Sequence, residues 1–204
     1  MEILKRFFPV CLLALALNVQ AQTSNLIDAF SKSYSLEASK KYDDAISVLN
    51  KAYDASSYET NLRLGWLHYL AGKQKESVAF YEKASNLMPS ATEPLWAVLK
   101  PLTALKQWDD CEKNYMKIIK LDPKNSVANY QLGMIYYNRK NYLNAKQYFD
   151  VSLILFPFDY DNMLMSAWTC LRLERNTDAK SLFNKVLLYR PNDASALDGL
   201  KQIK

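Results

Sequence analysis

Apolar and small residues recur at helical spacing in paired segments along most of the chain. Within residues 126–157, Leu132 and Tyr136 share one helical face, and the polar stretch "NRKNY" then interrupts the pattern. Ala145 and Phe149 form a second stripe at a spacing of four residues. A period near 3.6 residues predicts amphipathic helices, so this segment is expected to be two helices joined by a short turn.

The same paired pattern repeats along the chain, and prolines mark its period. Proline ends a helix because it has no N–H to donate and its ring clashes with the preceding turn. Asp122 or Asn125, with Ser126, then offers capping groups to the next helix. The four prolines that close successive segments are 34 residues apart: Pro89, Pro123, Pro157 and Pro191.

Small residues occupy matching positions in the paired helices. Gly65 and Gly133 lie in first helices, and Ser77 and Ala145 lie in second helices. A large side chain at the crossing would push the two helices apart. The pattern therefore predicts close crossings within each pair, with Tyr and Phe side chains filling the space on either side.

The stretches "LGWLHYLAGKQKESVAFYEKASNLMP" and "YQLGMIYYNRKNYLNAKQYFDVSLILFP" resemble the tetratricopeptide repeat family. The resemblance implies an all-α fold, a right-handed α-solenoid of about five helix–turn–helix repeats plus a C-terminal capping helix that covers the last apolar face. One such domain is expected over residues 22–204. The expected repeats are roughly 26–57, 58–91, 92–125, 126–159 and 160–193, with the capping helix at 194–204.

The third repeat departs from the pattern. It carries Leu99 where other repeats have glycine or alanine, and Pro101 lies in the middle of its first helix. A proline inside a helix costs about 3 kcal/mol and leaves the carbonyl of Ala97 without its usual donor. A kink is expected here, either as a tolerated irregularity or as a bend that reshapes a binding groove.

The first 21 residues have the features of a secretory signal peptide. Lys5 and Arg6 precede an apolar run over residues 7–17, and the stretch ends at Ala21, with cleavage expected before Gln22. The run is too short for a membrane span, which needs about 20 residues. We expect an exported bacterial protein, periplasmic or outer-membrane-associated, with secretion as an alternative and no transmembrane segment in the mature chain. A buried helix or an uncleaved anchor is the competing interpretation.

The composition offers little for catalysis. His68 is the single histidine and is expected to be covered in the core, and the four glycines are scattered. No Ser/His/Asp set, metal cluster or phosphate-binding loop is therefore expected. Carboxylates are spread over the predicted helices, and no pair of them is expected in a pocket. We expect no enzyme activity, no cofactor and no metal.

The charge distribution restricts the expected partners, and the cysteine positions restrict the expected disulfides. The chain has 26 basic and 21 acidic residues, interspersed without blocks of one sign, so nucleic acid is not an expected partner. Cys111 and Cys170 lie in different predicted repeats with two helices between them. Neighbouring helix axes lie about 8–10 Å apart, so we expect two buried free thiols and no disulfide.

Aromatic residues follow the predicted inner face of the first helices, and Trp108 is expected in a turn instead. Such a stripe predicts an aromatic-lined concave groove, because exposed apolar patches mark contact sites and Trp and Tyr dominate them. The competing interpretation is that these rings pack adjacent repeats together. The expected partner-binding residues, including two basic ones for the polar ends of a guest, are Phe30, Tyr34, Trp66, Tyr69, Trp96, Lys100, Tyr130, Tyr137, Trp168 and Arg172.

The best-known peptide site of the resembled family is a clamp of Lys, Asn and Arg for C-terminal carboxylates. Apolar residues such as Phe30, Leu62 and Trp96 occupy the corresponding hollow here, so the clamp is expected to be missing. We expect a non-catalytic interaction scaffold that binds an apolar or amphipathic segment of a protein or peptide partner. Exported members resemble components of exopolysaccharide secretion systems, which leaves glycan binding as one alternative. Self-assembly is another.

Overall fold

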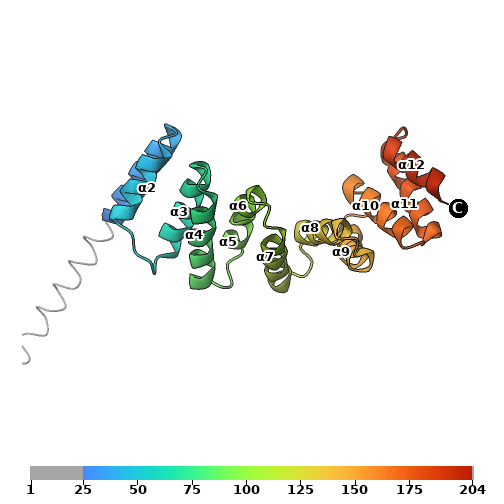
Figure 1. Ribbon diagram of the computed structural model, residues 1–204, viewed down its shortest axis with the longest axis horizontal. Helices are drawn as coiled ribbons and strands as arrows, with labels where there is room; N and C mark the ends of the chain where they lie inside the picture. The colour runs from blue at the N-terminus through green and yellow to red at the C-terminus, as the bar shows by residue number, and fades with distance from the viewer. Residues whose placement is uncertain (1–24, 204) are drawn as a thin grey trace, which may run out of the picture. The chain divides into compact units, whose positions relative to one another are not determined.

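The computed structural model describes residues 25–203, and the expected signal peptide lies outside this range. Within it, a helical segment over residues 25–38 is followed by eleven helices, α2 to α12, and the described residues contain no strand. Figure 1 shows these helices following one another in pairs along the chain. The predicted all-α class is confirmed.

The chain forms two compact units, with the boundary between Leu105 and Lys106. We call the described residues 25–105 the N-terminal unit and 106–203 the C-terminal unit. The boundary falls inside the predicted third repeat, between its two helices. The repeat pattern did not indicate this division.

The N-terminal unit is built from helix pairs around its own apolar core. Its helices after residues 25–38 are α2 (Tyr42–Lys51), α3 (Tyr58–Leu70), α4 (Gln74–Leu87), α5 (Glu93–Ala97) and α6 (Leu99–Ala104). The buried side chains of the first core cluster are Ala29, Ala45, Ile46, Leu49, Leu64 and Leu67.

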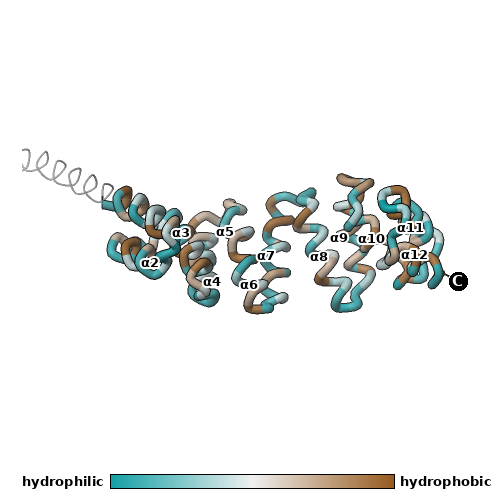
Figure 2. The backbone as a smooth tube through the Cα atoms, turned by 90° about the horizontal axis from the view of Figure 1, so that it is seen from above, coloured by the Kyte–Doolittle hydropathy of each residue, from teal (hydrophilic) through white to brown (hydrophobic). Residues whose placement is uncertain are grey.

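The C-terminal unit continues the same arrangement. Its helices are α7 (Trp108–Leu121), α8 (Ser126–Asn138), α9 (Tyr142–Leu155), α10 (Tyr160–Arg172), α11 (Asn176–Tyr189) and α12 (Ala194–Gln202). Hydrophobic and hydrophilic residues alternate along these helices at short intervals, as amphipathic packing requires (Figure 2). The core between α10, α11 and α12 consists of Met163, Ala167, Cys170, Ala179, Phe183, Val186 and Ala196.

The helix is interrupted just before Pro101, at the position where a kink was predicted. The helix stops at Ala97 and resumes at Leu99, so α5 and α6 are separate helices on either side of Val98. Proline cannot donate to the carbonyl of Ala97, and the next bond runs from Leu102 N to Val98 O at 3.1 Å. Pro101 itself is buried.

Close helix crossings occur where the small residues predicted them. A Cβ added at Gly133 would lie 2.5 Å from a ring carbon of Phe149, and one at Gly65 would lie 2.7 Å from the Tyr81 ring. Such distances are well inside van der Waals contact. The ring of the second helix therefore lies directly against the backbone of the first.

The turn inside each pair contains one residue with a left-handed backbone. Only Gly72, with φ of 75°, has the residue type that adopts this conformation without steric cost. At the other turns the same conformation is held by residues with side chains: Lys40, Lys106, Lys140 and Glu174, with φ of 58°, 58°, 60° and 59°.

Side-chain caps begin the first helix of several pairs. Asn125 accepts a hydrogen bond from Ala128 N, as the sequence suggested. Each cap satisfies one of the backbone N–H groups that a helix leaves unpaired at its start. Ser57 and Asp159 cap first helices in the same way, and Asp193 caps the C-terminal helix α12.

The predicted thiols and the histidine are buried. Cys111 and Cys170 are free and buried. The His68 side chain is 8 % exposed, and its ring stacks on Phe80 at a centroid distance of 5.0 Å. All three predictions are confirmed.

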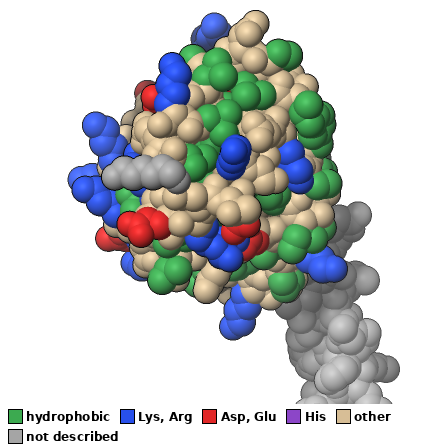
Figure 3. Space-filling view, turned by 90° about the vertical axis from the view of Figure 1, so that its right-hand side faces the viewer, with side chains coloured by type: hydrophobic (Ala, Val, Ile, Leu, Met, Phe, Trp, Pro, Cys, Tyr) green, Lys and Arg blue, Asp and Glu red, His purple; other side chains and the backbone are tan. Residues whose placement is uncertain are grey.

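The surface of the described residues has mixed charge. Figure 3 shows basic side chains spread over this face among hydrophobic and uncharged ones, several of them close together at one edge, with a few acidic groups nearby. No helix among residues 25–203 is long and apolar enough to cross a bilayer. No group of three or more potential metal ligands is found in the same range.

Candidate functional site

A groove of about 450 Å³ lies in the N-terminal unit, between the helical segment 25–38, α3 and α5. We call it the aromatic groove. Four side chains of the predicted inner face line it: Phe30, Tyr34, Leu62 and Trp66. The remaining lining residues are Tyr58, Glu59, Arg63, Tyr81, Glu93 and Ala97.

One wall of the aromatic groove comes from the helical segment 25–38. Phe30 and Tyr34 are one helical turn apart, so they lie on the same face, with ring centroids 6.4 Å apart. Tyr34 is 55 % exposed. The guanidinium of Arg63 covers one face of the Tyr34 ring, 3.9 Å from the ring centroid.

A buried polar network fixes the opposite wall. Glu37 accepts a hydrogen bond of 2.8 Å from the indole Nε1 of Trp66 and forms an ion pair with Arg63. The Nε of Arg63 donates to Ser33 Oγ at 3.1 Å. Because Arg63 is only 8 % exposed, its charge needs the compensation that Glu37 provides. The network holds the Trp66 indole in one orientation.

The rim of the aromatic groove is acidic. Glu59 and Glu93 both line it, and Tyr58 Oη donates to Glu93 Oε2 at 3.1 Å. Burial, reinforced by the Glu93 carboxylate, raises the pKa of Tyr58 to about 12. Arg63 is the one basic residue of the lining, and Glu37 already pairs with it. The expectation that no two carboxylates share a pocket was therefore wrong.

Two further predicted residues, Tyr69 and Lys100, lie beside the groove. The rings of Trp66 and Tyr69 are 5.7 Å apart, and Lys100 Nζ lies 5.0 Å and 5.9 Å from their centroids. Lys100 thus lies over two rings that were predicted to share the inner face with it. Trp96 is partly buried on α5 and is not among the lining residues.

In the C-terminal unit, Tyr130 borders two cavities, of about 300 Å³ and about 370 Å³. Its ring packs against Phe149 at 5.6 Å. Burial, with a smaller effect of the Asp161 and Asp159 carboxylates, raises the pKa of Tyr130. Tyr130 is thus both a packing residue and a cavity wall.

The other predicted residues of this unit line neither of these two cavities. Tyr137 contacts Tyr142 at 5.4 Å. Trp168 lies edge-on to Phe183 at 5.2 Å and donates from Nε1 to Ser195 Oγ at 2.9 Å. Arg172 lies over the Trp168 ring at 5.7 Å. The contacts of Tyr137 and Trp168 are packing contacts between helices, and Arg172 covers the Trp168 ring within α10.

Trp108 was predicted to lie in a turn, and this prediction was wrong. It is the first residue of α7 and is 51 % exposed, not part of the turn. With Tyr130 and Met134 it lines the 370 Å³ cavity. No side chain caps the start of α7, because Gln107 makes no capping hydrogen bond. No local sign in the sequence therefore indicated that the helix begins at Trp108.

Arg63 and Glu37 were also missed as groove residues. A signal for Arg63 was present, because the residues at 34-residue spacing from it are uncharged: Ala97, Gln131 and Met165. A charge at a position that is otherwise uncharged in a repeat indicates a local role. No comparable signal identified Glu37.

Two profiles described as tetratricopeptide repeat match the chain, over residues 30–89 and 114–147. No protein with curated annotation shows significant sequence similarity to it.

Several solved structures share the fold. A tetratricopeptide repeat protein from Parabacteroides merdae is 20 % identical, with a TM-score of 0.70, covering 88 % of this chain and 72 % of that one. MamA AMB-1 is 18 % identical, with a TM-score of 0.68, covering 85 % and 96 %. YrrB, described as a TPR protein with an unusual peptide-binding site, is 18 % identical, with a TM-score of 0.69, covering 92 % and 98 %.

Proposed function

The chain belongs to the tetratricopeptide repeat family, and from this premise we propose that it is a non-catalytic scaffold that binds a protein segment in the aromatic groove. Members of this family are generally interaction scaffolds. The fold is shared with YrrB, which is described as having a peptide-binding site. Function in such folds depends on the particular surface, so the proposal rests on the groove itself.

The observation that carries the proposal is the fixed orientation of the exposed Tyr34 ring and the partly buried Trp66 ring in the aromatic groove. Trp66 is held by Glu37, and Tyr34 is held by Arg63. Rings that are already ordered lose little conformational freedom when a guest binds, which favours affinity. Aromatic residues in partly enclosed pockets also dominate measured binding energies at interfaces.

The size and charge of the groove define the guest. A volume of about 450 Å³ suits one or two side chains with their backbone. The apolar walls favour an aliphatic or aromatic anchor, and the rim carboxylates of Glu59 and Glu93 favour a basic residue beside it. We therefore propose an amphipathic segment that combines an apolar anchor with lysine or arginine.

A peptide library displayed on phage tests this proposal. Peptides enriched on the protein are expected to pair an apolar anchor with a basic residue. Calorimetry is then expected to show about tenfold weaker binding to the Tyr34→Ala variant, because truncating a ring that anchors a guest costs 1 kcal/mol or more. Since Tyr34 is 55 % exposed, this substitution leaves the core intact.

Phe158→Ala is the matched control. Phe158 is 53 % exposed and belongs to the C-terminal unit, outside the aromatic groove. Its variant is expected to bind as tightly as the unmodified protein. Equal binding by Tyr34→Ala, or weaker binding by Phe158→Ala alone, would contradict the proposal. Light scattering over a concentration series checks that self-association does not occupy the groove.

The proposal includes export. Residues 1–21 have the charge, apolar run and small-residue ending of a secretory signal peptide. The binding partner is accordingly sought outside the cytoplasm, in the periplasm or at the outer membrane.

A further inference from the structure

A buried polar pair lies between α9 and α10, where the repeat is otherwise apolar. Asn162 is 5 % exposed and Ser152 is 1 % exposed. Burying a polar group costs free energy unless it finds a hydrogen-bond partner, so two buried polar residues at positions that are apolar in other repeats need an explanation. The residues at the same positions one repeat earlier and one repeat later are apolar and fully buried: Ala128 and Ala196 for Asn162, and Ile118 and Val186 for Ser152.

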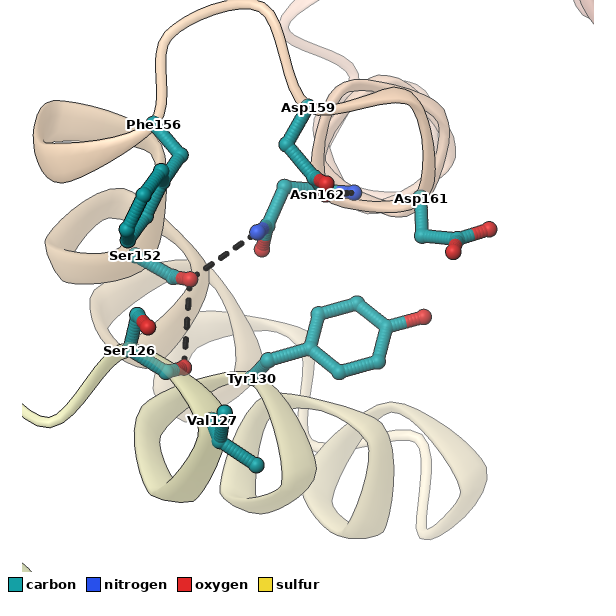
Figure 4. Close-up of a pocket in the computed structure, with 8 residues that line it drawn as sticks. All are labelled: Ser126, Val127, Tyr130, Ser152, Phe156, Asp159, Asp161 and Asn162. Carbon is teal, nitrogen blue, oxygen red and sulfur yellow. Dashed lines mark hydrogen bonds between the residues drawn. The ribbon is translucent and has the colours of Figure 1, made fainter.

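Hydrogen bonds determine which way the Asn162 amide points. Ser152 Oγ donates to Ser126 O at 3.2 Å, since a carbonyl can only accept. The hydroxyl oxygen must then accept from Asn162 Nδ2, at 2.9 Å, and both bonds are drawn in Figure 4. This leaves Asn162 Oδ1 on the other side of the amide. It is buried and has no hydrogen-bond partner.

Asn162 lines the cavity of about 300 Å³ that Tyr130 borders, which we call the polar cavity. Figure 4 shows the Tyr130 ring across from Asn162, with its hydroxyl end toward Asp161. Val127 and Phe156 add apolar walls. A volume of this size is at the lower end for ligand pockets, so it suits a single side chain better than a large ligand.

The charge of the polar cavity is negative. Asp159 and Asp161 both line it, and no lysine or arginine does. Asp159 Oδ1 caps α10 by accepting from Asn162 N at 2.9 Å. The side chain of Asp161 is exposed and makes no hydrogen bond or ion pair within residues 25–203. The cavity thus presents the unpaired carboxylate of Asp161, and the unpaired amide oxygen of Asn162 lies buried in its wall, so the group that both lack is a cationic donor.

We propose that the polar cavity binds a lysine side chain from a partner protein. The alkyl stem would lie against Val127 and Phe156, and the ammonium would meet the Tyr130 ring, Asp161 and Asn162 Oδ1. An ammonium donates three hydrogen bonds and is attracted by the faces of aromatic rings. The apolar walls favour an organic ammonium over a hydrated metal ion. This site is in the C-terminal unit and does not depend on the function proposed for the aromatic groove.

Titration of the ¹⁵N-labelled full chain, followed by NMR, tests the assignment. The probe is an acetylated and amidated peptide with one lysine between alanines. It is expected to shift the side-chain amide resonances of Asn162. Replacing lysine by Nε-acetyllysine removes the charge and is expected to abolish the shifts. An alanine peptide with a free amino terminus and Ca²⁺ alone are run as separate arms.

Two variants and a control locate the site. Asp161→Asn and Asn162→Ala are each expected to weaken binding about fivefold, the effect of losing one partly exposed ionic or polar contact. Asn162→Ala restores the residue found at this position in the neighbouring repeats. Asp28→Asn removes the same charge from an exposed position in the N-terminal unit and is expected to change nothing.

The outcomes are distinct. If the acetyllysine peptide binds equally, or Asp161→Asn binds like the unmodified protein, the proposal is wrong. The same follows if Ca²⁺ or the free amino terminus shifts Asn162 and the lysine peptide does not. If Asn162→Ala fails to fold, Asp161→Asn still decides the matter, since Asp161 is an exposed side chain without partners among the described residues.

Discussion

His68 is a titratable side chain enclosed by the N-terminal unit. Burial is the main cause that lowers its pKa, and the positive charge of Lys73 adds to the effect. At pH values between this lowered pKa and the pKa of about 6.5 in the unfolded chain, the unfolded chain binds more protons than the folded protein. Stability therefore falls as the pH drops through this window.

We expect urea denaturation to show a falling free energy of unfolding as the pH is lowered from about 7.5 toward 5. The His68→Phe variant, which keeps a ring against Phe80, is expected to lose this slope. A parallel pH profile for both proteins would mean that another group is responsible. Carboxylates with lowered pKa values, such as Glu112 and Asp193, act in a more acidic range and do not confuse the comparison.

At this scale the sequence predicted residues whose role follows from their own chemistry. The crossing glycines, the kinking Pro101 and the buried thiols are of this kind. Glu37 and Asn162 were not predicted, because their roles depend on partners: Glu37 pairs with Arg63 and Trp66, and Asn162 pairs with Ser152 on the preceding helix. A helical period places a residue on a face but does not identify the atom that it bonds.

Helices α8 and α9 cross where Gly133 meets the Phe149 ring. An alanine methyl would lie 2.5 Å from that ring, so Gly133→Ala forces the helices apart. Overpacking of this kind costs about 1–3 kcal/mol. We expect Gly133→Ala to lower the unfolding free energy by about that amount, although alanine favours helix over glycine by up to about 1 kcal/mol.

A double-mutant cycle checks the cause of this loss. In a Phe149→Leu background the ring is absent, and the added methyl is expected to cost much less. The difference between the two backgrounds measures the clash. Equal losses in both backgrounds would show that the crossing at Gly133 is not the reason.

Most elements could be predicted because a helix pair is a local structure. Apolar period, capping residues and closing prolines all lie within the segment that they shape. The break between α5 and α6 was also visible, because Pro101 acts on the turn directly before it. The start of α7 at Trp108 was not, since helix boundaries depend on contacts as well as on local pattern.

At the scale of the whole molecule, the proposed export predicts where the mature chain is found and which residue it begins with. Expressed in a bacterial host, the protein is expected in the periplasmic fraction with Gln22 as its first residue, as mass spectrometry or N-terminal sequencing can determine. Replacing Lys5 and Arg6 by glutamate is expected to reduce export, because the positive region of a signal peptide is lost. Recovery of the full-length chain in the cytoplasm would contradict this.

The division into two units was not visible in the sequence. The closing prolines Pro89 and Pro123 keep their 34-residue spacing across the boundary at Leu105 and Lys106. Each repeat contacts mainly its neighbours in such folds, so the sequence reports the repeating unit well and the limits of compact regions poorly. The aromatic stripe predicted a concave groove, and within the N-terminal unit four of its residues line the aromatic groove, Phe30, Tyr34, Leu62 and Trp66.

The left-handed turn residues carry a consequence for how this protein can evolve. Lys106, Lys140 and Glu174 each hold a backbone that costs a residue with a side chain about 1 kcal/mol, where Gly72 avoids the cost. None of them lines the aromatic groove or the polar cavity. Substitution of one of these turn residues by glycine could offset the loss of folding stability caused by a new side chain on the surface. The surface of this protein could then change while its helix pairs are kept.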